Sequence, residues 1–232
     1  MGRGTSPAIV IAAGPGIGLA VARRFARGGL PIAVIARAGA TVAAIARELA
    51  RFDVAIVPLT ADVAEETALR TALDTAIAQL GPPEVVVYNA GMIQADTPGE
   101  LTTRRHLEAW AVNVVGAITA AAHVAPAMAR RGGGTYLITG GMPEPDPAYT
   151  SLSLGKAGVR ALAVLLDKQY APVGVRVATV TVGGPVAPGT AFDPDDIAEL
   201  YWRAHHSSRP DWRHDIAFPG SPGTRSPRDP AA

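Results

Sequence analysis

The feature that most constrains the fold of this chain of 232 residues is a regular alternation of short apolar runs with longer alanine-rich stretches. The apolar runs are almost continuous in valine, isoleucine, leucine and alanine, which is typical of strands covered on both faces. They predict six strands, over residues 8–13, 32–36, 54–59, 84–90, 135–139 and 175–182. The stretches between and after them predict helices over residues 16–27, 41–51, 65–80, 102–130, 150–170 and 194–206.

Strands that alternate with helices pair in parallel through right-handed crossovers. We therefore expect an α/β fold of three layers, a doubly wound parallel sheet that forms one domain over residues 1–218. Asp193 is placed to cap the last helix, which has Pro194 at its first position. The run DIAF, residues 215–218, predicts a short edge strand. Residues 219–232 are rich in proline, glycine and serine and predict a disordered tail.

The composition excludes several classes of protein. Apolar residues make up 48% of the chain and charged residues 18%, which indicates a packed core rather than global disorder. A net charge of +1 gives no electrostatic reason to expect nucleic acid or an anionic membrane surface as a partner. The absence of cysteine excludes disulfides, thiolate nucleophiles and cysteine-ligated metals.

Other segments bear on location and metal binding. The longest weakly apolar segment, residues 109–129, contains an asparagine, a histidine and a proline, so we interpret it as a buried helix and expect no membrane span. The apolar run near the N-terminus is too short for a signal peptide, and we expect a cytoplasmic protein. His205, His206 and His214 lack the spacing of a metal-binding helix, so we expect no metal site.

Gly14, Gly16 and Gly18 lie, with Ile17 between them, at the junction of the first strand and the first helix. Glycine here lets the backbone approach a pyrophosphate and lets the helix pack closely on the strand. The helix start offers free N–H groups and the positive end of its dipole to phosphates. The junction predicts dinucleotide binding in a Rossmann fold, although glycines also occur in ordinary tight turns.

The end of the second strand predicts which dinucleotide is bound. Folds that select NAD usually have an acidic residue there to hold the ribose 2′-hydroxyl, and this chain has Arg37 instead. A guanidinium pairs with a 2′-phosphate and stacks on adenine, so we expect NADP (NADPH) to be preferred over NAD. The alternative is a solvated surface arginine.

Further motifs follow in order along the chain. Asp62 and Val63 follow the third strand, and the sequence YNAG ends the fourth at Gly91. Asn113 lies in VNVVG, Lys156 in GKAGVRAL, and the last long strand runs into Val182 and Gly183. With these motifs the chain resembles the short-chain dehydrogenase/reductase family over residues 8–200. It departs from the family pattern at Ile11-Ala12, where Thr-Gly is usual, and at Tyr88, where asparagine is usual.

The resemblance implies a set of residues that contact the cofactor. Asp62 and Val63 correspond to the pair facing adenine, and Lys156 to the lysine that holds the ribose hydroxyls. The full set implied is Gly14, Gly16, Ile17, Gly18, Arg37, Asp62, Val63, Asn89, Ala90, Gly91, Lys156, Gly183 and Val186.

The resemblance also implies a serine, a tyrosine and a lysine that together handle a proton. Leu152 occupies the tyrosine position four residues before Lys156, and a hydrocarbon cannot transfer a proton. The serine position falls on Thr139 or Gly140, of which only Thr139 has a hydroxyl to hold a substrate oxygen. Asn113 is expected to organise a water that relays protons.

Three replacement proton donors remain open from the sequence: Tyr149, entering from the loop before the helix; Ser153, close to the face of Lys156; and a water relayed through Lys156 and Asn113. Tyr201, Trp202 and Trp212 follow the motif region, where aromatic residues serve either as substrate-pocket walls or as ordinary packing.

These observations predict an NADP-dependent oxidoreductase that interconverts a carbonyl and an alcohol on a small hydrophobic substrate, with a non-standard proton donor. One alternative is a catalytically impaired NADP-binding protein, a regulator or an inactive subunit. Another is a non-redox enzyme on the same scaffold, a dehydratase or cyclase. The resemblance and the apolar helices over 102–130 and 150–170 predict a homodimer or homotetramer.

Overall fold

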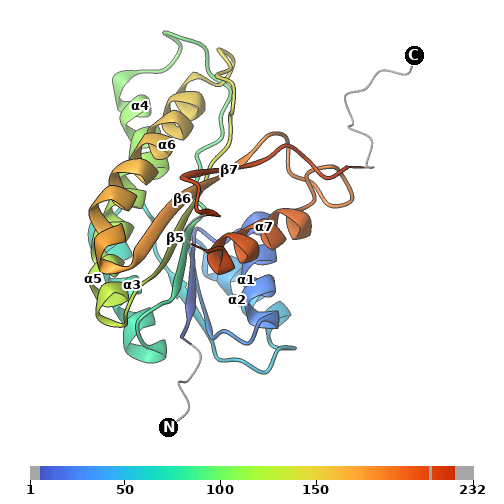
Figure 1. Ribbon diagram of the computed structural model, residues 1–232. Coiled ribbons are helices and arrows are strands. Elements are labelled where there is room, and N and C mark those ends of the chain that lie inside the picture. Colours follow the sequence, from blue (N-terminus) through green and yellow to red (C-terminus); the bar gives the residue numbers. More distant parts are fainter. Residues whose placement is uncertain (1–5, 209–210, 223–232) are drawn as a thin grey trace.

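The computed structural model describes residues 6–208 and 211–222. All strand pairs in its sheet are parallel, and the strand order is β3-β2-β1-β4-β5-β6-β7 (Figure 1). The doubly wound parallel sheet and the edge strand predicted from the sequence are both confirmed. The strands are β1 (Ala8–Ile11), β2 (Ile32–Ala36), β3 (Ile56–Thr60), β4 (Val85–Tyr88), β5 (Gly134–Thr139), β6 (Val175–Val182) and β7 (Asp215–Phe218).

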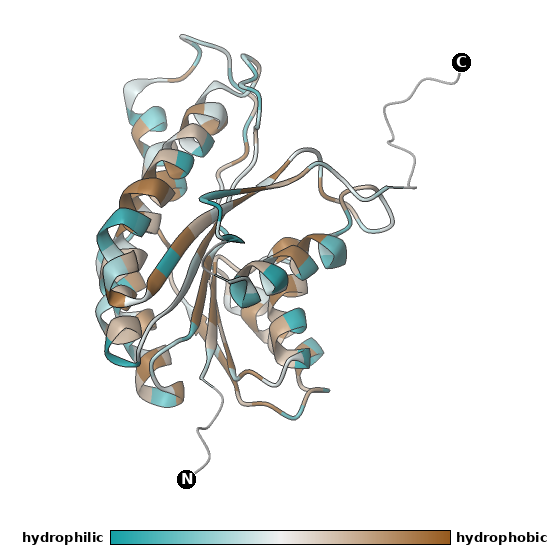
Figure 2. Ribbon diagram, in the orientation of Figure 1, coloured by the Kyte–Doolittle hydropathy of each residue, from teal (hydrophilic) through white to brown (hydrophobic). Residues whose placement is uncertain are grey.

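Helices cover both faces of the sheet, as the apolar strands require. One face is covered by α1 (Ile17–Arg27), α2 (Gly39–Leu49) and α7 (Pro194–His206). The other is covered by α3 (Glu66–Leu80), α5 (Gly116–Arg130) and α6 (Thr150–Tyr170), with α4 (Thr103–Trp110) beside them. Figure 2 shows the apolar strands enclosed between these two layers. The carboxyl ends of the strands meet at one edge of the sheet, where α/β folds place their ligands.

The helix predicted over residues 102–130 is interrupted. It consists of α4, a π-helical turn η1 (Ala111–Val115), and α5. The hydroxyl of Tyr88 donates a 2.6 Å hydrogen bond to the carbonyl oxygen of Val112, inside η1. By length and composition the span Thr103–Arg130 could cross a membrane, but 56% of its most apolar window is buried against the rest of the protein. It therefore packs as a core helix.

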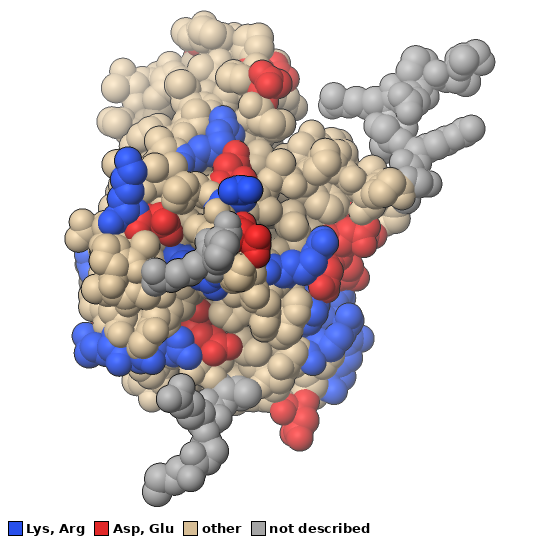
Figure 3. Space-filling view, in the orientation of Figure 1, with Lys and Arg blue, Asp and Glu red and all other residues tan. Residues whose placement is uncertain are grey.

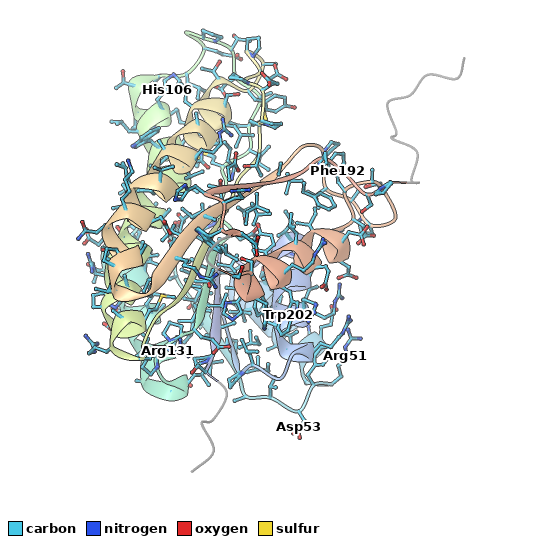
Figure 4. All side chains as sticks on the ribbon, in the orientation of Figure 1. Arg51, Asp53, His106, Arg131, Phe192 and Trp202 are labelled. Carbon is cyan, nitrogen blue, oxygen red and sulfur yellow. The ribbon has the colours of Figure 1, made fainter. Side chains whose placement is uncertain are left out.

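The last helix is anchored to the first. Asp193 caps α7 as predicted, since its side chain accepts a 2.8 Å hydrogen bond from the backbone N–H of Asp195. Arg24 of α1 forms an ion pair with Glu199 and lies 3.9 Å from the centre of the Trp202 ring. Trp202 packs between α7 and α1 (Figure 4). These contacts fix α7 against α1.

The C-terminal segment returns to the loop before α7. The backbone N–H of Ser221 donates a 2.7 Å hydrogen bond to the carbonyl oxygen of Ala191. The rest of the predicted tail, residues 223–232, lies outside the described residues. The face of the molecule in Figure 3 has basic and acidic side chains interspersed.

Candidate functional site

The glycine junction opens onto a cleft at the carboxyl edge of the sheet. A Cβ at Gly18 would lie 2.7 Å from the Cα of Ala13, so glycine allows α1 to pack against the end of β1. A Cβ at Gly14 or Gly16 would meet no atom of the described residues within 4 Å. Their backbone therefore faces open space. α1 begins at Ile17 with no side-chain cap.

The cleft has a volume of about 420 Å³, in the range of small-molecule and cofactor sites. It brings together seven of the residues predicted to contact a cofactor, from the ends of four strands. These are Gly14, Arg37, Asp62, Val63, Asn89, Ala90 and Gly91. Gly183 lies outside it, where its backbone N–H donates to the carbonyl oxygen of Phe218. Val186 lies in the loop after β6 with 38% of its surface exposed.

Two charged residues mark one end of the cleft. Arg37 is exposed and directly follows β2. Asp62, after β3, accepts a 2.9 Å hydrogen bond from the backbone N–H of Ala64 through one carboxylate oxygen. The local turn therefore holds Asp62 at the cleft, as Asx turns do.

Lys156 lies buried where β4 and β5 end. Its ammonium donates a 2.7 Å hydrogen bond to the carbonyl oxygen of Thr139 and contacts that of Ala90 at 3.5 Å. Burial, together with the smaller effect of the positive charge of Arg160, lowers the pKa of Lys156 to about 8. Arg160, one turn later on α6, donates hydrogen bonds to the carbonyl oxygens of Gly141 and Met142 at 2.9 and 3.2 Å.

Asn113 faces the same region from η1. Its Oδ1 accepts a 2.8 Å hydrogen bond from the backbone N–H of Met92, and its Nδ2 is buried with no hydrogen-bond partner among the described residues. A buried amide without a partner is unfavourable unless a water or ligand satisfies it. A Cβ at Gly91 would lie 3.5 Å from the Lys156 ammonium and 3.9 Å from Asn113 Oδ1, so the two side chains flank Gly91.

Leu152 is 6% exposed and lies one turn before Lys156 on α6. The helix begins at Thr150, which leaves Tyr149 two turns from Lys156 and outside the residues that line the cleft. The hydroxyl of Ser153 both accepts from the backbone N–H of Asp146, at 3.0 Å, and donates to its carbonyl oxygen, at 3.2 Å.

The hydroxyl of Thr139 points into the core under α1 and α7, on the face of the sheet opposite α6. It donates a 2.8 Å hydrogen bond to Asn89 Oδ1 and lies 2.7 Å from the hydroxyl of Tyr201. Asn89 in turn donates a 3.1 Å hydrogen bond from Nδ2 to the carbonyl oxygen of Ala12. Both neighbours of the Thr139 hydroxyl are thus protein groups, while its carbonyl holds Lys156.

Two buried residues outside the family motifs help to shape the site. Asp96 is 1% exposed and accepts hydrogen bonds from the backbone N–H and the hydroxyl of Ser151, at 2.9 and 2.8 Å. It thereby joins the loop after β4 to the first turn of α6, and these loops lie side by side in Figure 1. The second is Tyr201, for which the sequence predicts either a pocket wall or ordinary packing. It is 0% exposed, so it is no wall of an open pocket.

Comparison with known proteins identifies the family. The model of the short chain dehydrogenase family matches residues 6–193. The chain belongs to that family. Its members bind a nicotinamide cofactor, which agrees with the glycine cleft.

Curated relatives and solved structures agree with this assignment. The chain is 29% identical over 223 residues to 1-deoxy-11-beta-hydroxypentalenate dehydrogenase from Streptomyces exfoliatus, covering 88% of this chain and 81% of that one. It is 33% identical over 177 residues to 4-formylbenzenesulfonate dehydrogenase TsaC1/TsaC2 from Comamonas testosteroni, covering 75% and 70%. A metagenomic short-chain oxidoreductase, solved in complex with NADP, superposes with a TM-score of 0.83 at 21% identity, covering 93% and 98%. The family and the two curated relatives support an oxidoreductase, and the solved structure agrees in fold.

Proposed function

We propose that this short-chain dehydrogenase is an NADP-dependent oxidoreductase that interconverts a carbonyl and an alcohol on a small hydrophobic substrate. One observation carries the proposal. The Lys156 ammonium lies at the carboxyl ends of β4 and β5, where Ala90 and Gly91 line the cleft. Asn113, whose Nδ2 has no hydrogen-bond partner among the described residues, also flanks Gly91.

The residues at the cleft fit a dinucleotide. The open backbone at Gly14 and Gly16 suits the pyrophosphate, and the start of α1 at Ile17 supplies helix-dipole stabilisation. Gly18 allows the close packing behind them. Asp62 and Val63 suit the adenine end, and Asn89, Ala90 and Gly91 form the wall beside Lys156. Gly183 and Val186, on the loop after β6, are assigned to the nicotinamide end.

Arg37 supports the choice of NADP. It is an exposed guanidinium at the cleft, and the strand that precedes it ends without an acidic residue that would favour a free ribose 2′-hydroxyl. The metagenomic relative was solved in complex with NADP, which agrees with this assignment.

The proton donor we assign is the Lys156 ammonium, through a water shared with Asn113. An ammonium has three N–H groups, and Thr139 and Ala90 account for two. The water would accept from the third and from Asn113 Nδ2, and donate to the substrate oxygen. When bound, the cofactor supplies the hydride. Ser153 is committed to Asp146, and Thr139 takes a positioning role because its hydroxyl is bonded within the core.

Apolar residues border the region where a substrate would enter. Met92 lines the cleft, and the next residue, Ile93, is 76% exposed on the loop after β4. Val186 is exposed on the loop after β6. Exposed apolar side chains around a site indicate an apolar ligand, and this supports the hydrophobic substrate class.

The outer face of α4, η1, α5 and α6 supports assembly into a homodimer or homotetramer. Leu154 and Leu165 are 57% and 64% exposed and lie about three turns apart on one side of α6. The neighbouring helices add Leu107, Trp110, Val115 and Ile118 to this apolar surface. Sedimentation at micromolar concentration tests it. Introducing Leu154→Glu and Leu165→Glu together is expected to yield monomers, whereas a monomeric wild type would contradict the assembly.

Turnover and binding test the proposed function. NADPH oxidation with a panel of apolar aldehydes and ketones is expected for the wild type. Lys156→Met is expected to lower kcat by about 100-fold or more, the usual effect of losing an acid–base group. Equal kcat values for the two proteins would remove Lys156 from the mechanism. Failure of calorimetry to detect binding of either nicotinamide cofactor would contradict the whole assignment.

The buried hydrocarbon of Leu152 favours one second candidate, an NADP-binding protein without catalysis. Leu152→Tyr distinguishes the two, because it places a phenol one turn from Lys156. If the wild type already reduces carbonyl substrates, the added phenol is expected only to increase its existing kcat. A wild type that binds NADPH with no turnover, together with an active Leu152→Tyr variant, would favour the non-catalytic protein.

A further inference from the structure

We propose that Tyr201 of α7 is a positioning residue for the cofactor cleft and for Lys156, acting through Thr139. The inference rests on the proposed function and adds to it a residue outside the family match, which ends at residue 193. Tyr201 lies on α7, remote in sequence from the glycine junction, and the fold brings it beneath the carboxyl edge of the sheet.

The direction of the hydrogen bonds identifies Tyr201 as a donor. The single proton of the Thr139 hydroxyl goes to Asn89 Oδ1, at 2.8 Å. The 2.7 Å contact between Thr139 and Tyr201 must therefore use the Tyr201 proton. Burial raises the pKa of Tyr201, so its hydroxyl stays protonated at neutral pH.

Thr139 has two separate contacts to the site. Through its side chain and Asn89, Thr139 is connected to the carbonyl oxygen of Ala12, a residue that lines the cleft. Through its backbone carbonyl it holds the Lys156 ammonium at 2.7 Å. A change in the rotamer or position of Thr139 therefore alters both the floor of the cleft and the position of the lysine.

Tyr201 restrains the Thr139 side chain through the hydrogen bond between their hydroxyl groups. It is fully buried on α7, and α7 is itself fixed to α1 by the Arg24–Glu199 ion pair and by Trp202. Without the Tyr201 hydroxyl, the oxygen of Thr139 would be a buried acceptor with no donor, so the segment would relax to satisfy it. The relaxation would draw the Thr139 carbonyl away from Lys156.

The test compares Tyr201→Phe and Thr139→Val, singly and together, by calorimetric titration with NADPH and by the pH dependence of kcat. Each single variant is expected to weaken NADPH binding by about 5- to 30-fold, which corresponds to one buried hydrogen bond. Each is also expected to lower the apparent pKa of Lys156, because the ammonium loses a fixed acceptor. The double variant is expected to match Thr139→Val, and Thr139→Ser to retain wild-type values.

Tyr136→Phe is the matched control. Tyr136 is a buried tyrosine of β5 whose hydroxyl donates a 2.9 Å hydrogen bond to the carbonyl oxygen of Ala117, away from the site. It is expected to lower the melting temperature as much as Tyr201→Phe and to leave NADPH affinity and the pH profile unchanged.

Three results would overturn the inference: wild-type affinity and pH profile in Tyr201→Phe, additive effects in the double variant, or the same shifts in Tyr136→Phe. If Tyr201→Phe fails to fold, Thr139→Val and Thr139→Ser still decide, since equal behaviour of those two variants also overturns it. A wild type that binds neither NADPH nor NADH would overturn the proposed function itself, which separates the two failures.

Discussion

Gly155 of α6 packs directly against Asn113 of η1: a Cβ at Gly155 would lie 2.7 Å from the Cβ of Asn113 and 2.8 Å from its Nδ2. The helix that presents Lys156 and the π-helical turn that presents Asn113 therefore touch at a glycine of α6, where any larger residue would displace Asn113. The contact places both polar groups on either side of Gly91. The contact between Gly155 and Asn113 therefore determines how Lys156 and Asn113 are placed in the candidate site.

Gly155→Ala tests this contact. The methyl group is expected to displace Asn113 and to cost about 1–3 kcal/mol, of which the higher helix propensity of alanine offsets about 1. Gly158→Ala is the control, because its Cβ would meet the end of the Trp110 side chain at 2.9 Å, and that ring can move. Urea unfolding should show a net loss of stability only for Gly155→Ala, and kcat should fall in the same variant. Equal stability in both would disprove the steric argument.

Ala12 has a φ of 56°, a left-handed conformation that favours glycine. Ala12→Gly is expected to stabilise the protein by about 0.5–1 kcal/mol, because relief of the backbone strain exceeds the added entropy of the unfolded chain. The neighbouring Ala13→Gly, a buried position, serves as the control and is expected to destabilise. Chemical denaturation compares the two, and a destabilised Ala12→Gly variant would refute the prediction.

The buried Lys156 makes stability depend on pH. Its pKa is about 8 in the folded protein, below the ordinary value of 10.5. Below pH 8 Lys156 is protonated in both the folded and the unfolded protein, so the folded protein bears the full free-energy cost of the buried charge. Between pH 8 and 10.5 only the unfolded state binds it, so the free energy of unfolding rises with pH, by a total on the order of 3 kcal/mol.

Lys156→Met is expected to abolish that rise and to be more stable than the wild type at pH 7. The exposed Lys168→Met on the same helix is the control and should keep the wild-type slope. Denaturant midpoints measured at several pH values give both slopes. An unchanged slope in Lys156→Met would show that the lysine is not the group that titrates.

The rate of carbonyl reduction is expected to fall as pH rises through about 8, because the Lys156 ammonium then loses its proton. Arg160→Gln is expected to move this apparent pKa upward, since it removes the positive charge that disfavours the ammonium. Arg160→Lys keeps the charge and should leave the value close to the wild type. A kcat independent of pH between 6 and about 10 would exclude Lys156 as the proton source.

Arg37→Ala is expected to weaken NADPH binding by about 10-fold or more while changing NADH binding little, since only the former has a 2′-phosphate. Arg47→Ala removes the same charge from the exposed side of α2 and is the control. Titration calorimetry with NADPH and with NADH gives, for each variant, the ratio of its dissociation constant to that of the wild type. Parallel losses for NADPH and NADH, or similar losses in Arg47→Ala, would contradict a role for Arg37 in selectivity.

Local pattern determined most of the fold. The continuous apolar strands required a sheet covered on both faces, and the helix over residues 150–170 was predicted with its observed bounds. The glycine junction and Arg37 were assigned to a dinucleotide from the residues themselves, and the residues that end β3 and β4 from the family resemblance. The structure brings members of all these groups to one cleft, because parallel strands bring their carboxyl ends to a common edge. These features depend on residues close together in the chain.

Tertiary structure decided what single residues do at that edge. Successive side chains of a strand alternate between faces, so the register of β5 sends the Thr139 hydroxyl toward Tyr201 and leaves only its carbonyl for Lys156. The π-helical turn that presents Asn113 likewise depends on Tyr88 below it and Gly155 beside it. Such contacts join elements remote in sequence, and neither helix propensity nor hydrophobic periodicity contains information about them.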